Sequence, residues 1–264
     1  MRMARDGISA GLALGLLGRK AVVTTPPHTG RPLALAHRGV SAHAGDNTIE
    51  AFELAVAHGA DGVELDVRFT ADNVVMLNHD ADIGEMGPLI HHDFVTVRAH
   101  HPEIPTLDEA LAVLVDLIIN VEIKNSPMDA DYDSTHRMAA VVARWVARHD
   151  IHDRVIVTSF NPDTVAAVRV ADNTIVTGQL VDVGFDIVRG VEAIAAAGHS
   201  WIAPFVADVV ANARGTIEAA HQAGLLVVTW TADDPADIAT VAAAGIDAII
   251  SNDPGATLRI LTHG

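Results

Sequence analysis

Cysteine is absent from the 264-residue chain, and positive charge is scarce. Without cysteine, a disulfide framework, a zinc–thiolate site and a cysteine nucleophile are excluded, and a cytoplasmic protein is the natural expectation. Only 17 Lys and Arg stand against 34 Asp and Glu, which gives a net charge of −17. That balance argues against nucleic-acid binding and against stable association with anionic membrane surfaces, because both need basic patches. Half of the residues are hydrophobic, so intrinsic disorder is excluded as well.

Residues 1–32 are predicted to form an N-terminal segment and a linker ahead of the folded domain. The apolar run at 8–17 is too short to span a bilayer, and no Ala-x-Ala-like cleavage site follows it. A structural segment of a cytoplasmic protein is therefore favoured, while export stays open if residues 1–25 act as a signal. The prolines and the glycine within 24–32 break both helix and strand periodicity and indicate the linker.

From residue 33 onward, short apolar runs alternate with alanine-rich helical stretches. Runs that are apolar on both faces and separated by helices are typical of a parallel sheet. Eight such runs predict a single (β/α)8 TIM barrel over residues 33–264, with a doubly wound open sheet as the alternative. The runs are 33–37, 62–67, 117–123, 155–160, 174–181, 200–205, 225–230 and 247–251.

A ninth apolar run, at 74–77, follows the second strand with only a turn-like tetrapeptide between them. This spacing predicts the return arm of a hairpin and not another barrel strand. An antiparallel hairpin centred between Asp72 and Asn73 would place His79 opposite Asp66. A short insertion follows the hairpin before the next helix.

Polar side chains with complementary chemistry follow four consecutive elements of this pattern. In a parallel barrel the carboxyl ends of the strands meet at one rim, where catalytic residues gather. Turn propensity explains one polar strand end, but it does not explain four with matching chemistry. The group contains two histidines, three carboxylates and two cations, namely His37, Arg38, Glu64, Asp66, His79, Glu122 and Lys124.

The three carboxylates predict a metal site. Glu64 and Asp66 are two residues apart and share a strand face, and Glu122 ends the next barrel strand. Close together they would repel one another unless a hard cation lies among them. Oxygen ligands select one divalent ion, Mg²⁺ or Ca²⁺, with Mn²⁺ as a third candidate. His37 and His79 can act as general acid and base near neutral pH, although the sequence does not decide which does which.

The two cations indicate phosphate binding. Lys124 is one of only two lysines in the chain, the other being Lys20, so a compact ammonium is expected at this strand. The planar guanidinium of Arg38 suits phosphate oxygens. Metal, cations and an acid–base pair together fit phosphodiester cleavage.

These residues belong to an ordered motif series. The order and spacing of the series resemble the glycerophosphodiester phosphodiesterase family of phospholipase C-like TIM barrels, over residues 33–257. The motifs are His37-Arg38-Gly39, Asn47-Thr48, Glu64-Leu65-Asp66-Val67, His79-Asp80, Pro105-Thr106-Leu107 and Glu122-Ile123-Lys124, followed by Ser159-Phe160, Thr229-Trp230 and the run at 249–254.

The resemblance implies a hydrolase that cleaves a small-molecule glycerophosphodiester to glycerol 3-phosphate and an alcohol. It implies acid–base catalysis by the two histidines and binding of one divalent cation by the three carboxylates. It implies that Arg38 and Lys124 bind the phosphate, and Asn47 of the motif series is a further candidate for substrate binding. Phe160 and Trp230 end their strands and are expected to shape the glycerol pocket, with ordinary packing at the barrel top as the alternative.

Two departures from the family pattern concern substrate choice. Asp46 stands where the family usually has a glutamate before the Asn-Thr pair. The insertion at 81–104, which covers the pocket in the family, is short here and holds two histidine pairs. A solvated polar lid is favoured for it over a second metal site.

Further along the chain, Asp233 and Asp234 are typical of a loop and a helix start.

Two other functions stay open at this point. One is a lysophospholipase D-type phosphodiesterase, and the other is a barrel that binds a phosphoester without cleaving it. The two acid–base histidines argue against the second, because a pure binder does not need them. The sequence leaves the oligomeric state open.

Overall fold

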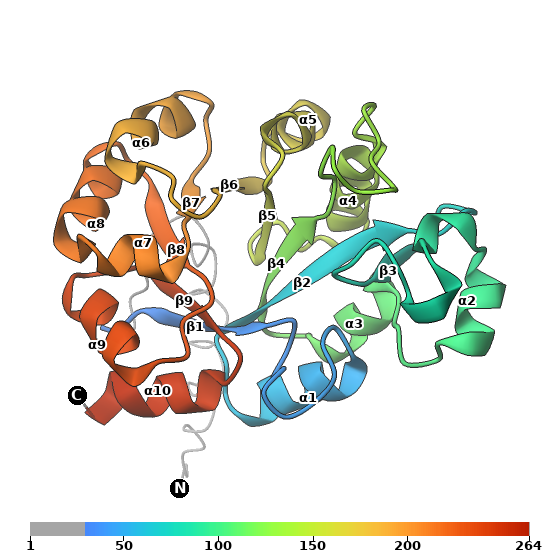
Figure 1. The fold of residues 1–264 in the computed structure, drawn as a ribbon, viewed down its shortest axis with the longest axis horizontal. Coiled ribbons are helices and arrows are strands. Elements are labelled where there is room, and N and C mark those ends of the chain that lie inside the picture. The colour runs from blue at the N-terminus through green and yellow to red at the C-terminus, as the bar shows by residue number, and fades with distance from the viewer. Residues whose placement is uncertain (1–29, 264) are drawn as a thin grey trace, which may run out of the picture.

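The computed structural model describes residues 30–263, so the predictions for the apolar run at 8–17 and for a signal within 1–25 lie outside the described residues. Within 30–263, strands and helices alternate as the sequence predicts (Figure 1). The strands are β1 (Leu33–His37), β2 (Gly62–Phe69), β3 (Val75–Leu77), β4 (Ile118–Ile123), β5 (Val155–Ser159), β6 (Val176–Leu180), β7 (Trp201–Ala203), β8 (Leu226–Thr229) and β9 (Ala248–Ser251).

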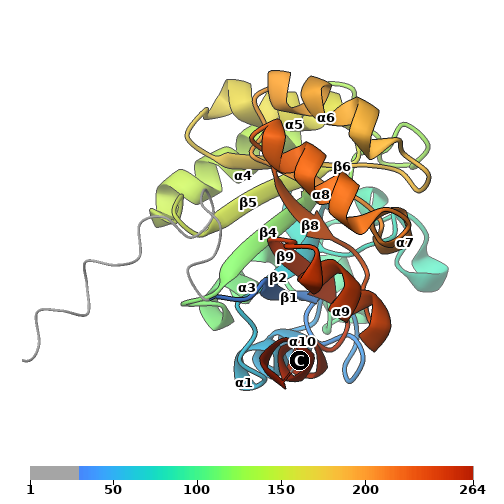
Figure 2. The ribbon, with the colours of Figure 1, turned by 90° about the vertical axis from the view of Figure 1, so that its left-hand side faces the viewer.

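Eight parallel strands of the described range close into a barrel. Their order is β1-β9-β8-β7-β6-β5-β4-β2, and β1 also pairs with β2, with His37 opposite Glu64. This last pairing joins the two edges that an open sheet would leave free. The TIM-barrel prediction is therefore confirmed and the doubly wound alternative is wrong. Figure 2 shows the strands surrounded by helices.

The outer face of the barrel is covered by helices with sequence-encoded starts. Thr48 accepts a hydrogen bond from the N–H of Ala51, and Thr106 forms a reciprocal capping box with Glu109. No helix within residues 30–263 has both the length and the apolar character needed to cross a membrane. The covering helices are α1 (Ile49–Ala57), α3 (Leu107–Val113), α4 (Arg137–His149), α5 (Pro162–Ala171), α6 (Ile187–Ala196), α7 (Val206–Val210), α8 (Ala213–Gln222), α9 (Pro235–Ala243) and α10 (Pro254–His263).

The inner face of the barrel has an apolar lower layer and a polar rim at the carboxyl ends of the strands. Side chains alternate along a strand, so every second residue points inward. Leu33 and Leu35 of β1 belong to the internal apolar cluster, and His37 occupies the next inward position. The same two-residue step leads along β4 from Ile118 to Glu122. Each of these strands therefore contributes to the apolar core near its amino end and to the polar rim near its carboxyl end, with side chains on the same face.

The hairpin of β2 and β3 confirms the predicted strands, but its register differs by one residue. Asn78, and not His79, lies opposite Asp66, because the N–H of Asn78 donates to the carbonyl of Asp66 at 3.2 Å. The connecting loop has three residues, 71–73, and Asn73 adopts a φ of 64°. A left-handed residue at the end of a three-residue loop is a common hairpin closure. The sequence prediction assumed a loop with an even number of residues, and its register was therefore wrong.

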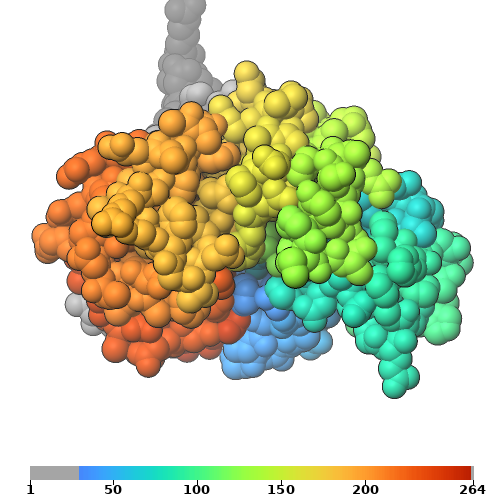
Figure 3. Space-filling model, turned by 45° about the horizontal axis from the view of Figure 1, so that its top comes forward, coloured from blue at the N-terminus to red at the C-terminus, as the bar shows by residue number. Residues whose placement is uncertain are grey.

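The insertion after β3 projects from one side of the molecule (Figures 1 and 3). It contains two short 3-10 turns, Gly84–Met86 and Leu89–His91, and the helix α2 (Phe94–His100). His91 and His100 are exposed, as is the apolar Val95 of α2. Its Ile83, Leu89, Val97 and Ile104 pack in a small apolar cluster with Met76 of β3.

The turn after β1 allows a test of how tightly the rim is packed. Gly39 has a φ of 82°, and a Cβ there would lie 2.6 Å from the Cβ of Ala51. Gly224, after α8, has the same φ but no neighbour within 4 Å of a built Cβ. We expect Gly224→Ala to lower the free energy of unfolding by about 1–2 kcal/mol, the left-handed penalty. We expect Gly39→Ala to lose roughly 1–3 kcal/mol more through overpacking.

Denaturant titration of both variants measures these losses. Equal losses would show that the crowding at Gly39 relaxes without cost and would contradict the prediction.

Candidate active site

Three carboxylates meet on the inner face of the barrel rim. β2 supplies Glu64 and Asp66, β4 supplies Glu122, and the parallel register sets Asp66 beside Glu122. One oxygen of each carboxylate lies within 4.8 Å of the others. All three residues are buried, and Asp66 is only 1% exposed. The structure thus brings together the three predicted metal ligands, which we call the carboxylate cluster.

Burial and mutual repulsion oppose ionisation of the carboxylate cluster. Burial, followed by the charges of Asp66 and Glu122, raises the pKa of Glu64 well above its usual value. Burial and Asp66 also raise the pKa of Glu122. For Asp66, the effect of burial is outweighed by Lys124 and Arg38, so the pKa is lowered. The cluster therefore needs more positive charge than the two cations supply.

Two oxygens of the carboxylate cluster fit a metal ion. Glu64 Oε1 and Asp66 Oδ1 are buried and have no hydrogen-bond partner. A buried acceptor without a partner carries its full desolvation cost, which a cation among the carboxylates would remove. An all-oxygen donor set suits a hard divalent ion. Across residues 30–263, no other group of three or more histidines or carboxylates has metal-ligand spacing, and the histidine pairs of the insertion do not form one.

Arg38 contacts the carboxylate cluster through its main chain and its side chain. Its φ is 54°, and its N–H donates to Glu64 Oε2 at 3.0 Å. Its guanidinium pairs with Asp46, Nη1 to Oδ2 at 2.8 Å, and approaches Asp66, Nε to Oδ2 at 3.3 Å. Asp46, one methylene shorter than the usual glutamate, therefore keeps an ion pair at the rim.

Asn47 lies behind Asp66 and orients it. Its amide nitrogen donates to Asp66 Oδ2 at 2.9 Å, and its amide oxygen accepts from the N–H of Asp66 at 3.2 Å. The residue is 2% exposed. Its visible function is to fix the Asp66 carboxylate, and the predicted contact with substrate stays a prediction.

Lys124 contacts the carboxylate cluster at other oxygens than Arg38 does. Its Nζ lies 2.7 Å from Glu122 Oε1 and 3.6 Å from Asp66 Oδ1. Burial would lower the pKa of this amine, but Glu122 and Asp66 outweigh it and raise the pKa above its usual value. The ammonium is therefore charged at neutral pH, as phosphate binding requires.

Each of the two predicted acid–base histidines has its Nδ1 hydrogen-bonded. His37 Nδ1 lies 2.7 Å from Asn252 Oδ1, and His79 Nδ1 lies 2.7 Å from Asp80 Oδ1. Because both partners are acceptors, each Nδ1 carries the proton and each Nε2 presents a lone pair. Burial lowers the pKa of both rings, and the charge of Lys124 adds to this for His79. Both rings are therefore neutral near pH 7 and able to accept a proton.

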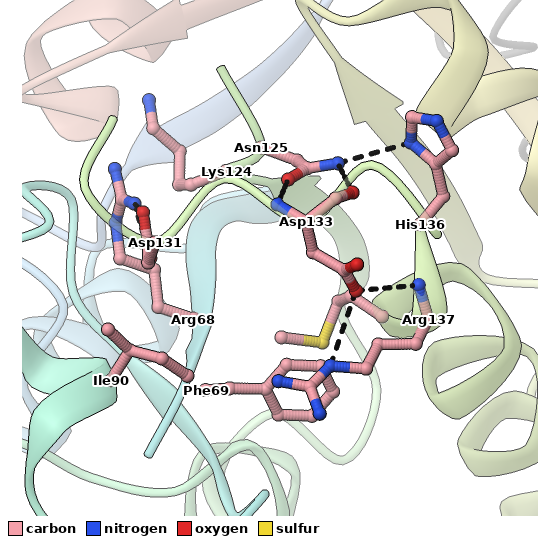
Figure 4. Close-up of a pocket in the computed structure, with 10 residues that line it drawn as sticks. Arg68, Phe69, Ile90, Lys124, Asn125, Asp131, Asp133, His136 and Arg137 are labelled. Atoms are coloured by element: carbon pink, nitrogen blue, oxygen red, sulfur yellow. Dashed lines mark hydrogen bonds and ion pairs between the residues drawn. The ribbon is translucent and has the colours of Figure 1, made fainter. Parts of the chain in front are cut away.

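Arg68 is a site residue that sequence reasoning missed. Its guanidinium donates to the carbonyl of His79 at 2.8 and 3.0 Å and pairs with Asp131 and Asp129. It thereby ties the hairpin to the loop after β4, where Figure 4 shows it beside Asp131. The signal was available, because Arg68 follows Asp66 by the same two-residue step that separates Asp66 from Glu64.

The two predicted rim aromatics form an apolar wall. The rings of Phe160 and Trp230 pack edge to face, with centroids 5.5 Å apart, and Phe205 lies against Trp230 at 5.3 Å. The Nζ of Lys124 lies 5.9 Å from the centre of the Phe160 ring. The aromatic wall thus lies beside Lys124, and its contact with substrate stays a prediction.

Two hollows flank the carboxylate cluster. One, of about 310 Å³, is lined by His79, Lys124 and Phe160. The other, of about 480 Å³, is lined by His37 and Arg38. Each hollow therefore has one histidine and at least one cation, since Arg68 also lines the hollow of His79, and this suits a phosphodiester with a group on either side of its phosphate.

Asn252 and Asp233 were also missed by sequence reasoning. Asn252 follows β9 at an inward position and contacts His37, and Asp233 accepts from the Asn252 amide. Asp234 caps α9, as its position indicates, but Asp233 does not act as a cap. No local pattern distinguishes the two aspartates, because the partner of Asp233 lies on another strand.

Comparison with known proteins places this site in a family. The model of the Glycerophosphoryl diester phosphodiesterase family matches residues 37–256. The uncharacterized protein YqiK of Bacillus subtilis is 31% identical over 249 residues, which cover 86% of this chain and 98% of YqiK. A glycerophosphodiester phosphodiesterase of Caldanaerobacter subterraneus is 26% identical, over 89% of this chain and 99% of that enzyme.

Solved structures agree with the fold. A glycerophosphodiester phosphodiesterase of Thermotoga maritima has a TM-score of 0.73 and 25% identity, over 87% of this chain and 98% of that one. A phosphodiesterase of Oleispira antarctica, in complex with the product sn-glycerol-3-phosphate, has a TM-score of 0.76 and 20% identity, over 88% and 97% of the two chains. The chain belongs to the glycerophosphoryl diester phosphodiesterase family and is a phosphoric diester hydrolase.

Proposed function

We propose that this protein hydrolyses a glycerophosphodiester to glycerol 3-phosphate and an alcohol by His/His acid–base catalysis with a divalent cation. One observation carries the proposal: two imidazoles and two cations are gathered with the buried carboxylate cluster at the barrel rim. The product bound to the Oleispira antarctica relative supports the same substrate class.

Substrate binding depends on positive charge at the rim. The protein carries a net charge of −17, so its overall field does not attract an anionic phosphodiester. Arg38 and Lys124 supply the local positive charge, and the guanidinium offers its planar donors to phosphate oxygens. Glu64, Asp66 and Glu122 would hold the cation, which when bound supplies charge that neutralises the phosphate oxygens.

Proton transfer is the task of the two imidazoles. One Nε2 accepts the proton of the attacking hydroxyl as its oxygen bonds to phosphorus. The other ring first takes up a proton from solvent at Nε2, and it donates that proton to the alkoxide oxygen as the bond between that oxygen and phosphorus breaks. His37 and His79 line different hollows, which suits a proton entering and a proton leaving on two sides of the phosphate.

Removing either imidazole tests this mechanism. We expect His37→Ala and His79→Ala each to lower kcat by about 10²–10⁴-fold, the contribution of a positioned acid–base group. The release of glycerol 3-phosphate from glycerophosphocholine measures turnover. The control is His100→Ala, an exposed histidine on α2, which should keep wild-type activity. Turnover within a few-fold of wild type in either test variant would rule out that histidine.

The cation site is tested by binding and stability as well as by turnover. In the metal-free protein, glycerol 3-phosphate should bind weakly, because the carboxylate cluster repels it. Mg²⁺, Ca²⁺ or Mn²⁺ should strengthen binding in calorimetry and restore turnover after chelation. A cation at 100 times its Kd should stabilise the fold by about 2.7 kcal/mol. Glu64→Gln should lose these effects, whereas Glu53→Gln, an exposed control on α1, should keep them.

The pH dependence of the metal-free protein has a defined sign. The folded pKa of Glu64 lies above its ordinary value of 4.5, so the unfolded chain releases this proton first as pH rises. The stability contribution present below pH 4.5 is then lost as pH rises through the folded pKa. In chelator, wild type should therefore become less stable relative to Glu64→Gln with rising pH, as measured by thermal unfolding. If the difference in thermal stability between wild type and Glu64→Gln stayed constant with pH, this would contradict an ionising Glu64 at this position.

An apolar hollow favours a second candidate substrate. It has about 570 Å³, lies between α5 and α6, and shares Phe160 and Asp182 with the hollow that holds His79. Such a space suits the acyl chain of a lysophospholipid, which is a phosphodiester of the same kind. Glycerophosphocholine and lysophosphatidylcholine have the same head group, so their relative turnover isolates the acyl chain.

Ala193→Phe fills this hollow without touching the carboxylate cluster. If lysophospholipids are substrates, the variant should lower turnover of lysophosphatidylcholine and leave glycerophosphocholine unchanged. No turnover of lysophosphatidylcholine by wild type would exclude the second candidate.

A further inference from the structure

Three polar side chains form a line across neighbouring strand ends. His37 ends β1, Asn252 follows β9, and Asp233 follows β8, and these three strands are adjacent in the barrel. His37 Nδ1 lies 2.7 Å from Asn252 Oδ1, and Asn252 Nδ2 lies 2.5 Å from Asp233 Oδ2. The line therefore connects a catalytic imidazole to a carboxylate that does not touch it.

Asp233 decides which way the Asn252 amide faces. The carboxylate accepts from the N–H of Asn252 at 2.8 Å and from the hydroxyl of Ser251 at 2.9 Å, so three donors hold it in place. An ionised carboxylate has no proton to give, and the Asn252 atom that faces it must be the NH₂ group. The amide oxygen then faces His37, and the hydroxyl of Ser41 donates to the same oxygen at 2.7 Å.

The orientation of the amide determines the tautomer of the imidazole. A ring nitrogen that faces an amide oxygen must carry a proton, and a neutral imidazole has only one. We propose that Asp233, acting through Asn252, fixes His37 as the Nδ1–H tautomer and reserves its Nε2 for proton transfer. Asp233 and Asn252 are then positioning residues of the reaction, and this role rests on the proposed function of His37.

The same geometry predicts what Asp233→Asn would do. The carbonyl oxygen of the new amide would keep accepting from the N–H of Asn252 and the hydroxyl of Ser251. Its NH₂ would face the Asn252 side chain, which turns its oxygen toward that NH₂ to avoid two opposed donors. The Asn252 NH₂ would then face His37 Nδ1, which must act as acceptor, so the proton moves to Nε2.

An exchange of the two residue types restores the original pattern. In Asp233→Asn/Asn252→Asp, the new carboxylate at 252 accepts from His37 Nδ1 and from the NH₂ at 233. The carbonyl at 233 still accepts from the main chain and from Ser251. Asp234→Asn is the matched control, since it removes the same charge one residue away and keeps a good helix cap.

The tautomer is measured directly by long-range ¹H–¹⁵N NMR of the imidazoles at pH 8, with the His37 signals identified by their absence in His37→Gln. We expect Nδ1–H in wild type, Asp234→Asn and the exchange variant, and Nε2–H in Asp233→Asn. In turnover of glycerophosphocholine, Asp233→Asn should lose about 10²-fold in kcat, with little change in KM. The exchange variant should recover most of the loss.

Nδ1–H in Asp233→Asn, or wild-type kcat in that variant, would overturn the proposal. An exchange variant that folds but keeps the tautomer of Asp233→Asn would do so too. The NMR measurement needs no turnover. A tautomer that responds as expected in a protein without glycerophosphodiesterase activity would therefore support the positioning role and reject the proposed function.

Discussion

The repulsion among three buried carboxylates is the constraint on which the site depends. Glu64, Asp66 and Glu122 lie close together in a place from which water is largely excluded. Arg38 and Lys124 each approach a different oxygen of Asp66, so this carboxylate stays ionised while its neighbours resist ionisation. Three carboxylates face only two cations, and this excess of negative charge makes the cluster a suitable cation site. The imidazoles of His37 and His79 are neutral near pH 7, so they add no charge to this centre.

The barrel provides this arrangement through its strand period. Alternate residues of β1 and β4 place apolar side chains in the interior near the amino ends and polar ones at the rim, and β2 adds Glu64 and Asp66 to that rim. A closed sheet brings β1 and β2 side by side, and so His37 lies next to Glu64. Hydrogen bonds from Asn47 and Arg68 then fix the site from behind, through Asp66 and the His79 carbonyl. The apolar core and the site are thus successive layers of side chains on the inner face of the barrel.

The fold and much of the candidate site could be predicted because their signals are local. Strands that are apolar on both faces and separated by helices leave few architectures, and residues two apart share a face wherever the strand is placed. The hairpin between β2 and β3 shows the limit of such reasoning. Its strands follow from the apolar runs, but its register depends on Asn73 taking a left-handed conformation in a three-residue loop. A shift of one residue then changes the partner of Asp66.

The sequence by itself indicated the barrel, the three carboxylates, the two histidines and the two cations, because residue type and the repeating strand pattern point to each, although the register of His79 did not follow from them. Only the tertiary structure decided how these groups are held. Asn252 is 215 residues from His37 in sequence, and Asp233 acts on a side chain of a neighbouring strand. Hydrogen-bond direction across strands depends on which atoms face one another after the barrel has closed. No pattern along one strand contains that information.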